Sequence, residues 1–428
     1  MSDHERAFSR RRLLKRGVTL ASLTPTVPWF VQNAAEGLAP SAATPTRTPG
    51  ADRILVIVQL GGGNDGLNTV VPFFSDDYRR ARPRLALGAP GRPGPAGAAL
   101  PLDETAGLGL HPSLTGLRDL HADGLLGVIQ GVGYPNPNRS HFASMDIWQT
   151  GRTDGQGTGW LGRYFDHQCN GTPSPQAAIA LGRDAPLALV GDVQKPIAFE
   201  DESLFRWRGD DLHPAMARPY ESMVRAGSLA GVDPDSQAAY LMRTSLDAQV
   251  SSDRIRAAVR RAEGVSYPRS GLANQLRLIA AMIRDEMPTR VYYAKIGGFD
   301  THGGQLGSHA NLMRQVGDAI AAFQGDLDGQ GVRDHVLTMV FSEFGRRVAE
   351  NGSAGTDHGT AAPMFLVGGK ARPGVVGDHP SLVDLDRGDL RHTIDFRSVY
   401  AGILSEWFQV DPRPILGADH PSARLIVP

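Results

Sequence analysis

The sequence has almost no cysteine, no excess of charge of either sign and no long hydrophobic run. Only one of its 428 residues is a cysteine, Cys169, which excludes an intrachain disulfide and a cluster of thiolate metal ligands. The 44 Lys and Arg residues balance 45 Asp and Glu residues, and no basic, aromatic-rich motif is present, so we expect no binding to nucleic acid. Because the chain has only one cysteine, any metal site must use His, Asp or Glu.

The N-terminus carries a pattern typical of an export signal. Ser9–Lys15 reads SRRRLLK, which matches the paired arginines of a twin-arginine signal, and a mildly apolar run, Gly17–Val31, follows it. Two prolines interrupt that run, and it falls short of the roughly 20 apolar residues that cross a bilayer. We expect residues 1–48 to be a signal peptide and linker read by the twin-arginine export machinery. The mature protein would then be periplasmic or secreted, without a membrane span; an uncleaved anchor is the alternative.

The rest of the chain alternates strand and helix patterns. Short apolar runs, most of them rich in β-branched residues, predict buried strands at Ile54–Leu60, Leu125–Gln130, Val291–Ile296 and Val336–Phe341. Apolar residues at helical spacing predict a helix within Ser308–Leu327 and another directly after Ser270. This alternation predicts an α/β fold in which a mostly parallel sheet is covered on both sides.

The 41% of hydrophobic residues provide enough material for a large core, and no clear linker divides the chain after the export signal. We therefore expect residues 49–428 to form one domain. Gly88–Pro101 is rich in Gly, Pro and Ala and predicts a surface loop. The polar, helix-prone stretch at about 200–269 holds no candidate site residue and predicts a helical cap or insertion.

Polar segments gather where the predicted strands end, which is where ligands bind in open α/β sheets. These segments are Gly61–Asn68, Gly297–Gly304, Ser342–Arg346 and the nearby Asp357–Thr360. The first contains the spacing G-x-G-x-x-G, which also occurs in dinucleotide-binding folds. That interpretation needs a helix to open at the third glycine, whereas β-branched residues and Pro72 follow here, so we reject it.

The same segments supply candidate metal ligands of the oxygen and imidazole type. They are Asp65, Asp300, His302, Glu343 and His358. Taken singly, each could instead cap a turn, pair with a nearby arginine or lie on the surface. Their repetition at predicted strand ends favours one joint metal site.

A further candidate lies between the Leu125 strand and a predicted helix at Ala143–Gln149. Ser140 occupies the expected N-cap position of that helix, with Arg139 beside it. Ser140 could simply cap the helix. Alternatively, it could act as a nucleophile, because the free amides and the dipole at a helix N-terminus favour a negatively charged group.

Taken together, these motifs resemble the DUF1501 family of exported bacterial proteins, which itself looks like a branch of the alkaline phosphatase and sulfatase superfamily. The segments that carry the resemblance are VQLGGGNDGLNTVVP, RSHFASMDIWQTG, GFDTHGGQ, FSEFGRR, TDHGTAAPMFLVGGK and DFRSVYAGIL. The resemblance implies a three-layer α/β/α sandwich whose strand-end loops bind one or two divalent metals around a nucleophile. It assigns Asp65, Asp300, His302, Glu343 and His358 as metal ligands and Ser140 as the nucleophile.

The chain departs from the superfamily pattern at two points. The phosphatases usually have Asp-His where this chain has Glu343 and Phe344, and their other Asp and His are spaced further apart than Asp300 and His302. The lost histidine leaves the second site rich in oxygen, which favours Mg, Mn or Ca over Zn there, or an empty site.

Two hypotheses follow. The first is a metal-dependent hydrolase of small anionic phosphate or sulfate esters, in which Arg139 or Arg346 clamps the non-bridging oxygens and Ser140 attacks. One cation would lie on Asp300, His302 and His358, and a second on Asp65 and Glu343, with Zn, Mn, Mg and Ca all open. The second hypothesis is a non-catalytic exported binding or assembly protein on the same scaffold, supported by the departure at Phe344.

Overall fold

A computed structural model describes residues 52–169, 174–200, 254–260 and 266–427. The expected export signal at 1–48 and most of the expected cap at 200–269 lie outside the described residues. Of the cap, the helical stretch 254–260 is described, and its Ile255 and Ala258 are buried against the main core. No helix in the described part is long and apolar enough to cross a membrane.

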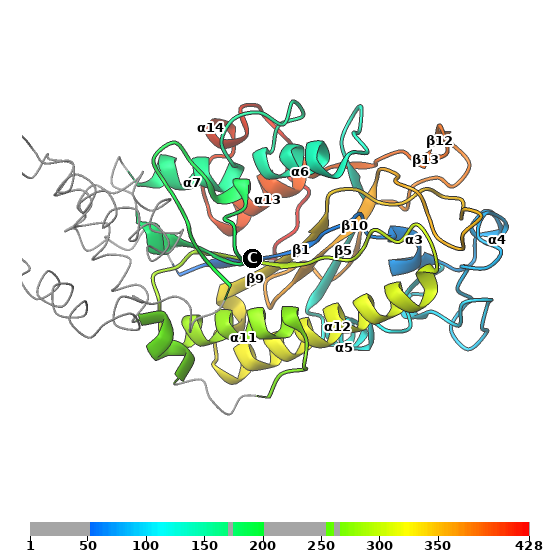
Figure 1. The fold of residues 1–428 in the computed structure, drawn as a ribbon, viewed down its shortest axis with the longest axis horizontal. Helices are drawn as coiled ribbons and strands as arrows, with labels where there is room; N and C mark the ends of the chain where they lie inside the picture. Colours follow the sequence, from blue (N-terminus) through cyan, green and yellow to red (C-terminus); the bar gives the residue numbers. More distant parts are fainter. Residues whose placement is uncertain (1–51, 170–173, 201–253, 261–265, 428) are drawn as a thin grey trace, which may run out of the picture.

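The centre of the fold is a nine-stranded sheet (Figure 1). Its strands, in spatial order, are β11 (Gly374–Val376), β5 (Leu126–Gly133), β10 (Ala362–Val367), β9 (Val336–Ser342), β1 (Ile54–Leu60), β8 (Val291–Ile296), β6 (Ala178–Leu181) and β7 (Ile197–Phe199). The short β14 (Ile394–Asp395) pairs with the end of β5. All pairings are parallel except the two made by β10. The four predicted strands are confirmed as β1, β5, β8 and β9.

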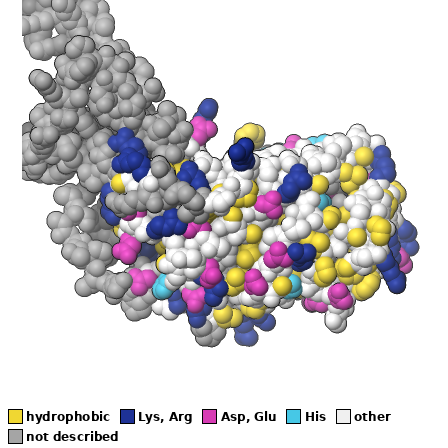
Figure 2. Space-filling model, turned by 90° about the horizontal axis from the view of Figure 1, so that it is seen from below, with side chains coloured by type: hydrophobic (Ala, Val, Ile, Leu, Met, Phe, Trp, Pro, Cys, Tyr) yellow, Lys and Arg dark blue, Asp and Glu magenta, His cyan; other side chains and the backbone are white. Residues whose placement is uncertain are grey.

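Helices cover both faces of the sheet, which confirms the three-layer α/β/α architecture (Figure 1). One layer holds α5 (Thr115–Ala122), α11 (Gly271–Arg284) and α12 (Gln305–Gly329). The other holds α6 (His141–Thr150), α7 (Trp160–Gln168), α13 (Phe396–Gly402) and α14 (Arg413–Leu416). On the face seen in Figure 2, acidic and basic side chains are interspersed, in keeping with the balanced net charge.

The sequence of β1 explains why it lies at the centre. Its side chains alternate between the two faces, so Val56 and Val58 join the core beneath α11 and α12, whereas Leu55 and Ile57 join the core beneath α6 and α13. A strand buried on both faces must be apolar throughout, as this one nearly is. The helix predicted after Ser270 is α11, and the Ser270 side chain caps it by accepting from the amide of Ala273.

Smaller elements complete the described chain. They are α3 (Gly66–Thr69), α4 (Asp76–Ala81), the three-stranded sheet of β2 (Val70–Pro72), β4 (Leu108–Leu110) and β3 (Leu100–Asp103), and the hairpin of β12 (Leu385–Asp386) and β13 (Asp389–Leu390). Short 3₁₀ turns occur at Pro175–Ala177, Leu187–Leu189 and Arg333–His335, and a π-helical turn at Ile403–Trp407. Gly88–Pro101 consists of turns and isolated bridges until β3 begins at Leu100.

The topology brings five loops to one edge of the sheet. The strands β5, β9, β1 and β8 are mutually aligned, so their carboxyl ends meet there. The strand β10 runs in the opposite direction between β5 and β9, so the residues before its first residue, Ala362, reach the same edge. These five neighbouring strands carry the residues of the candidate site.

Candidate metal centre

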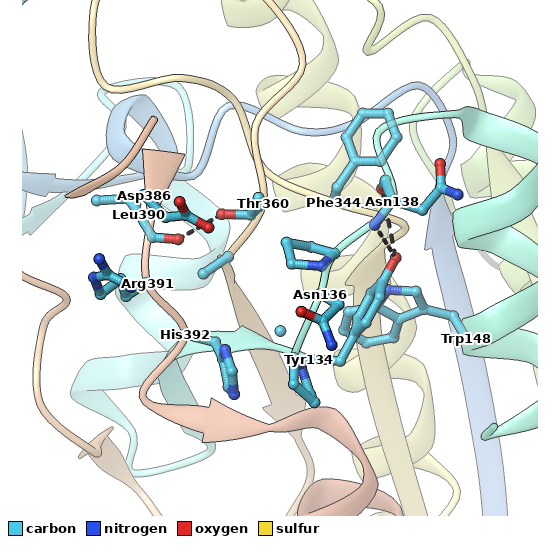
Figure 3. A pocket seen from close by; sticks show the side chains of 14 residues that line it. Tyr134, Asn136, Asn138, Trp148, Phe344, Thr360, Asp386, Leu390, Arg391 and His392 are labelled. Atoms are coloured by element: carbon cyan, nitrogen blue, oxygen red, sulfur yellow. Dashed lines mark hydrogen bonds between the residues drawn. The ribbon is translucent and has the colours of Figure 1, made fainter. Parts of the chain in front are cut away.

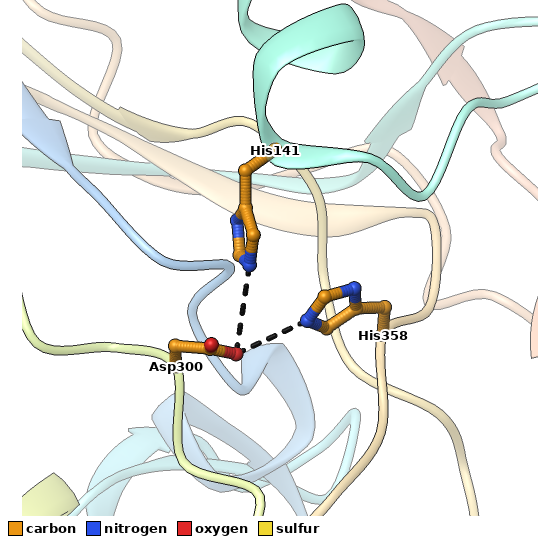
Figure 4. A group of neighbouring side chains, drawn as sticks. All are labelled: His141, Asp300 and His358. Carbon is orange, nitrogen blue, oxygen red and sulfur yellow. Dashed lines mark hydrogen bonds and ion pairs between the residues drawn. The ribbon is translucent and has the colours of Figure 1, made fainter.

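Three imidazoles converge on one oxygen of Asp300. His302 and Asp300 follow β8, His358 precedes β10, and His141 is the first residue of α6. The distances from Asp300 Oδ1 to Nε2 are 3.0 Å for His302, 3.1 Å for His358 and 3.6 Å for His141. Figure 4 shows Asp300 between His141 and His358. Three different parts of the chain thus contribute four atoms to a common point, two of them from the segment after β8.

The other nitrogen of each imidazole has an acceptor of its own. His141 Nδ1 lies 2.9 Å from Glu343 Oε1, His302 Nδ1 lies 3.1 Å from Asp357 Oδ1, and His358 Nδ1 lies 2.9 Å from the Arg139 carbonyl. Each Nδ1 therefore lies within hydrogen-bond distance of a carboxylate or carbonyl oxygen, which can hold the ring in its orientation. The Nε2 atoms of all three rings face Asp300. This is the arrangement by which outer partners orient metal-binding histidines.

The resulting cluster of nitrogen and oxygen atoms fits a cation. His302 Nε2 and His358 Nε2 are only 2.9 Å apart, and His141 Nε2 is buried without a hydrogen-bond partner among the described residues. One ligand atom from each of His141, Asp300 and His358 lies within 4.8 Å of the other two. Two imidazole nitrogens and one carboxylate oxygen form a donor set that suits Zn²⁺, and His302 lies beside it.

Arg346 links Asp300 to the neighbouring loops. Its guanidinium is buried and donates to Asp300 Oδ1 at 2.7 Å, to the Gly63 carbonyl at 2.6 Å and to the Thr356 carbonyl at 2.9 Å. Burial opposes ionisation, but hydrogen bonds from Arg346 and His358 prevail and lower the pKa of Asp300 to about 2. We expected Arg346 to clamp substrate oxygens; the structure instead commits it to the loops that hold the cluster, because the side chain is already fully paired.

Glu343 lies behind His141 rather than beside a second metal. Its carboxylate is buried, and Oε1 accepts from the Gly62 amide at 2.8 Å as well as facing His141 Nδ1. The second oxygen accepts from the Ser342 hydroxyl at 3.1 Å. The contacts assign Glu343 the role of orienting His141.

Asp65 is not brought to the imidazole cluster by any contact among the described residues. Its carboxylate pairs with Arg82, at 2.6 Å from Nη1, and also accepts from the Gln305 amide; both charged side chains are fully buried. Burial alone would raise the pKa of Asp65, but the charge and hydrogen bond of Arg82 outweigh it and lower the pKa. No described contact joins Asp65 to Glu343, so the expected second site on these two carboxylates is not assembled. Asp65 Oδ2 is engaged with Arg82 and Gln305, whereas its Oδ1 is buried without a partner among the described residues.

Ser140 and Arg139 directly precede His141. Ser140 is the N-cap residue of α6, but its side chain makes no capping hydrogen bond and is exposed. The Arg139 guanidinium pairs with Asp389 and keeps 37% of its side chain exposed. Ser140 therefore does not cap the helix with its side chain, which was the alternative to a role as nucleophile.

The sequence analysis missed two residues of the cluster. His141 follows Ser140 in a segment that was already singled out, and Asp357 immediately precedes His358. The available signal for His141 was an imidazole near the expected start of a helix. For Asp357 it was a carboxylate beside a candidate ligand.

A cavity of about 310 Å³ adjoins the cluster (Figure 3). Phe344 lines it, and the Phe344 ring packs against both His141 and His358, with centroid distances of 4.9 Å to each. The buried Phe344 therefore belongs both to the cavity wall and to the surroundings of the two imidazoles.

Comparison with known proteins gives a family match. Residues 127–414, more than half of the chain, match the profile described as "Protein of unknown function (DUF1501)". No curated protein matches the chain. Among solved structures, Ps i-CgsB in complex with k-i-k-neocarrahexaose is similar with a TM-score of 0.35 and 10% identity, covering 86% of this chain and 73% of that one. The lipoteichoic acid synthase LtaP from Listeria monocytogenes is similar with a TM-score of 0.30 and 10% identity, covering 83% and 75%. Both scores are low, so the description of the fold rests on the sheet and helices above.

Proposed function

The chain belongs to the DUF1501 family, which has no assigned function, and we propose from its site that it is a metal-dependent hydrolase of phosphate or sulfate esters. The observation that supports this proposal is the convergence of three Nε2 atoms on Asp300 Oδ1, with each Nδ1 held by an acceptor. Such a site binds one divalent cation, with Zn²⁺ favoured by the donor set. Export through the twin-arginine pathway, to the periplasm or beyond, is part of the same proposal.

The cation, when bound, would supply Lewis acidity to an oxygen of the ester. The chain supplies the remaining parts. Ser140 Oγ would attack phosphorus or sulfur while the ester bond breaks, and the serine proton would leave with the alcohol; water would then release the acid from Ser140. The free amides at the start of α6 and the part-exposed Arg139 guanidinium would offset the negative charge of the acid group.

One observation favours a second candidate, a non-catalytic binding or assembly protein. Phe344 occupies a position where a metal-binding histidine was expected from the superfamily pattern, and its ring fills the space against His141 and His358. With Asp65 paired to Arg82, one candidate metal centre rather than two remains among the described residues. A single structural cation on a binding scaffold would need no nucleophile.

Elemental analysis of the full-length protein purified from the cell envelope tests the metal site. We expect close to one divalent cation per chain, lost in Asp300→Ala and in His358→Ala. The matched control is His335→Ala, which changes an exposed histidine in the 3₁₀ turn just before β9 and should keep the metal. Metal-free protein with full native stability would instead mean that protonated imidazoles hold Asp300, and would overturn the proposal.

Hydrolysis of aryl phosphate and aryl sulfate esters then separates the two candidates. For a hydrolase with Ser140 as nucleophile, Ser140→Ala should lower kcat by at least about a hundredfold while the metal content stays constant. A metal-loaded protein without turnover would favour the binding protein. A Ser140→Ala variant with unchanged turnover would mean that a different group is the nucleophile.

A further inference from the structure

We propose that the cavity beside Phe344 binds a neutral, polyhydroxylated ring of the carbohydrate type. Resting on the proposed function, this ring is the alcohol part of the ester whose acid group is processed at the metal centre. The cavity volume of about 310 Å³ lies at the small end of ligand pockets, which span roughly 300–1,000 Å³. The cavity therefore suits a group of one or two rings rather than a long chain.

The cavity wall and the metal centre are built from the same segments of the chain. Asn138 lines it and accepts from the Ser140 amide at 2.8 Å through its side-chain oxygen, so the cavity wall leads directly to His141. Phe344 follows Glu343, and Thr360 lies two residues after His358. Three segments that carry the cluster thus also form the cavity wall, and one substrate could reach both.

The wall of the cavity includes aromatic side chains. Trp148 lines the cavity and is 2% exposed, and Tyr134 lines it as well. Aromatic rings give a ring-shaped ligand an apolar surface to pack against.

Asn136 adds an exposed amide in a constrained conformation. Its backbone has a φ of 53°, in the left-handed region that non-glycine residues rarely adopt, and its side chain lines the same cavity. Asparagine tolerates this conformation better than most residues do. An amide presents both a donor and an acceptor, which matches a hydroxyl group on either side.

The charges of the cavity disfavour a free anion. The Arg391 guanidinium is already paired with Asp384, with Nε 3.1 Å from Oδ1, and Asp386 adds a carboxylate to the wall. Burial lowers the pKa of His392, which keeps that imidazole neutral near pH 7. Paired charge, amides and aromatic rings together recognise hydroxyl groups and the apolar face of a sugar ring.

Calorimetric titration of the full-length protein with neutral methyl glycosides tests the proposal. The probes are the methyl pyranosides of glucose, galactose, mannose and N-acetylglucosamine, with inorganic phosphate as the anionic probe. We expect at least one glycoside to bind, and Asn136→Gly to weaken it about fivefold, as expected for the loss of one hydrogen bond of about 1 kcal/mol.

The matched control is Gln409→Gly. Gln409 is an exposed residue with a φ of 59°, so this variant makes the same backbone change outside the cavity and should leave the affinity unchanged. Absence of glycoside binding at tens of millimolar, equal affinity in Asn136→Gly and the parent, or phosphate competing for the cavity would overturn the proposal. Glycoside binding requires neither metal nor turnover, so a protein that binds the glycoside but hydrolyses no ester supports the cavity and refutes the hydrolase.

Discussion

At the scale of single residues, the partners of the histidines define the site more than the histidines do. Glu343, Asp357 and the Arg139 carbonyl are three different acceptors, yet each lies at the Nδ1 atom of its histidine. Because the acceptor lies behind the ring, the Nε2 atom of each histidine faces Asp300. A carboxylate at a strand end can therefore serve the site without touching the metal.

Asp65 illustrates the opposite case, and it gives the first prediction. Asp65→Asn should lower the free energy of unfolding by about 3–5 kcal/mol, because it leaves the buried Arg82 guanidinium without its counter-charge. The metal content should not change, since no described contact links Asp65 to the imidazoles. Urea unfolding and elemental analysis measure the two effects.

The control for this variant is Asp76→Asn, which removes an ion pair with Arg79 on the surface. Exposed pairs contribute about 0–1 kcal/mol, so its effect should be small. If Asp65→Asn lost the metal and kept its stability, Asp65 would be a ligand after all.

At the scale of elements, the strands and their polar ends could be predicted from sequence, because both depend on local patterns. The run Ile54–Leu60 and the loop after it are one example. The antiparallel insertion of β10 could not be predicted, since it depends on pairing with β5 and β9, which are distant in sequence. That insertion brings His358 to the carboxyl edge. The direction of a side chain could not be predicted either. Asp65 and Glu343 both follow strands, but Asp65 pairs with Arg82, whereas Glu343 contacts His141.

The loop after β1 supports the second prediction. Gly63 has a φ of 74°, and a Cβ atom there would lie 2.3 Å from the Phe344 ring. Gly63→Ala should therefore displace Phe344 and, through it, His141 and His358. We expect metal affinity to fall by about tenfold or more, the size of effect seen when the supports of a ligand are disturbed.

Gly91→Ala is the matched control, because Gly91 has a φ of 72° but nothing within 4 Å of the added Cβ. It carries the same backbone strain, about 1 kcal/mol, without the clash. Competition with a chelator of known affinity measures both variants. Equal metal affinities in Gly63→Ala and Gly91→Ala would mean that Phe344 does not position the imidazoles.

At the scale of the whole molecule, one small centre ties together loops that come from distant parts of the chain. His141, Asp300 and His358 belong to three separate segments, and Arg346 joins them to the loop after β1 through the Gly63 carbonyl. The sheet beneath has its own two cores and does not depend on these contacts. A ligand that binds only the folded state stabilises it by mass action, by about 4 kcal/mol when its free concentration is 1,000 times its Kd.

Removal of the metal should consequently loosen one edge of the molecule while the sheet stays intact. After treatment with a chelator, we expect faster amide hydrogen exchange in the segments 139–145, 299–304 and 343–360, together with a lower Tm. Exchange in β1 and β9 should not change, because their amides are paired within the buried sheet. The control is His358→Ala, which should exchange like the chelated protein and respond no further to the chelator. Uniformly faster exchange across β1 and β9 would mean that the metal supports the fold as a whole, whereas an unchanged pattern would mean that these loops hold no cation.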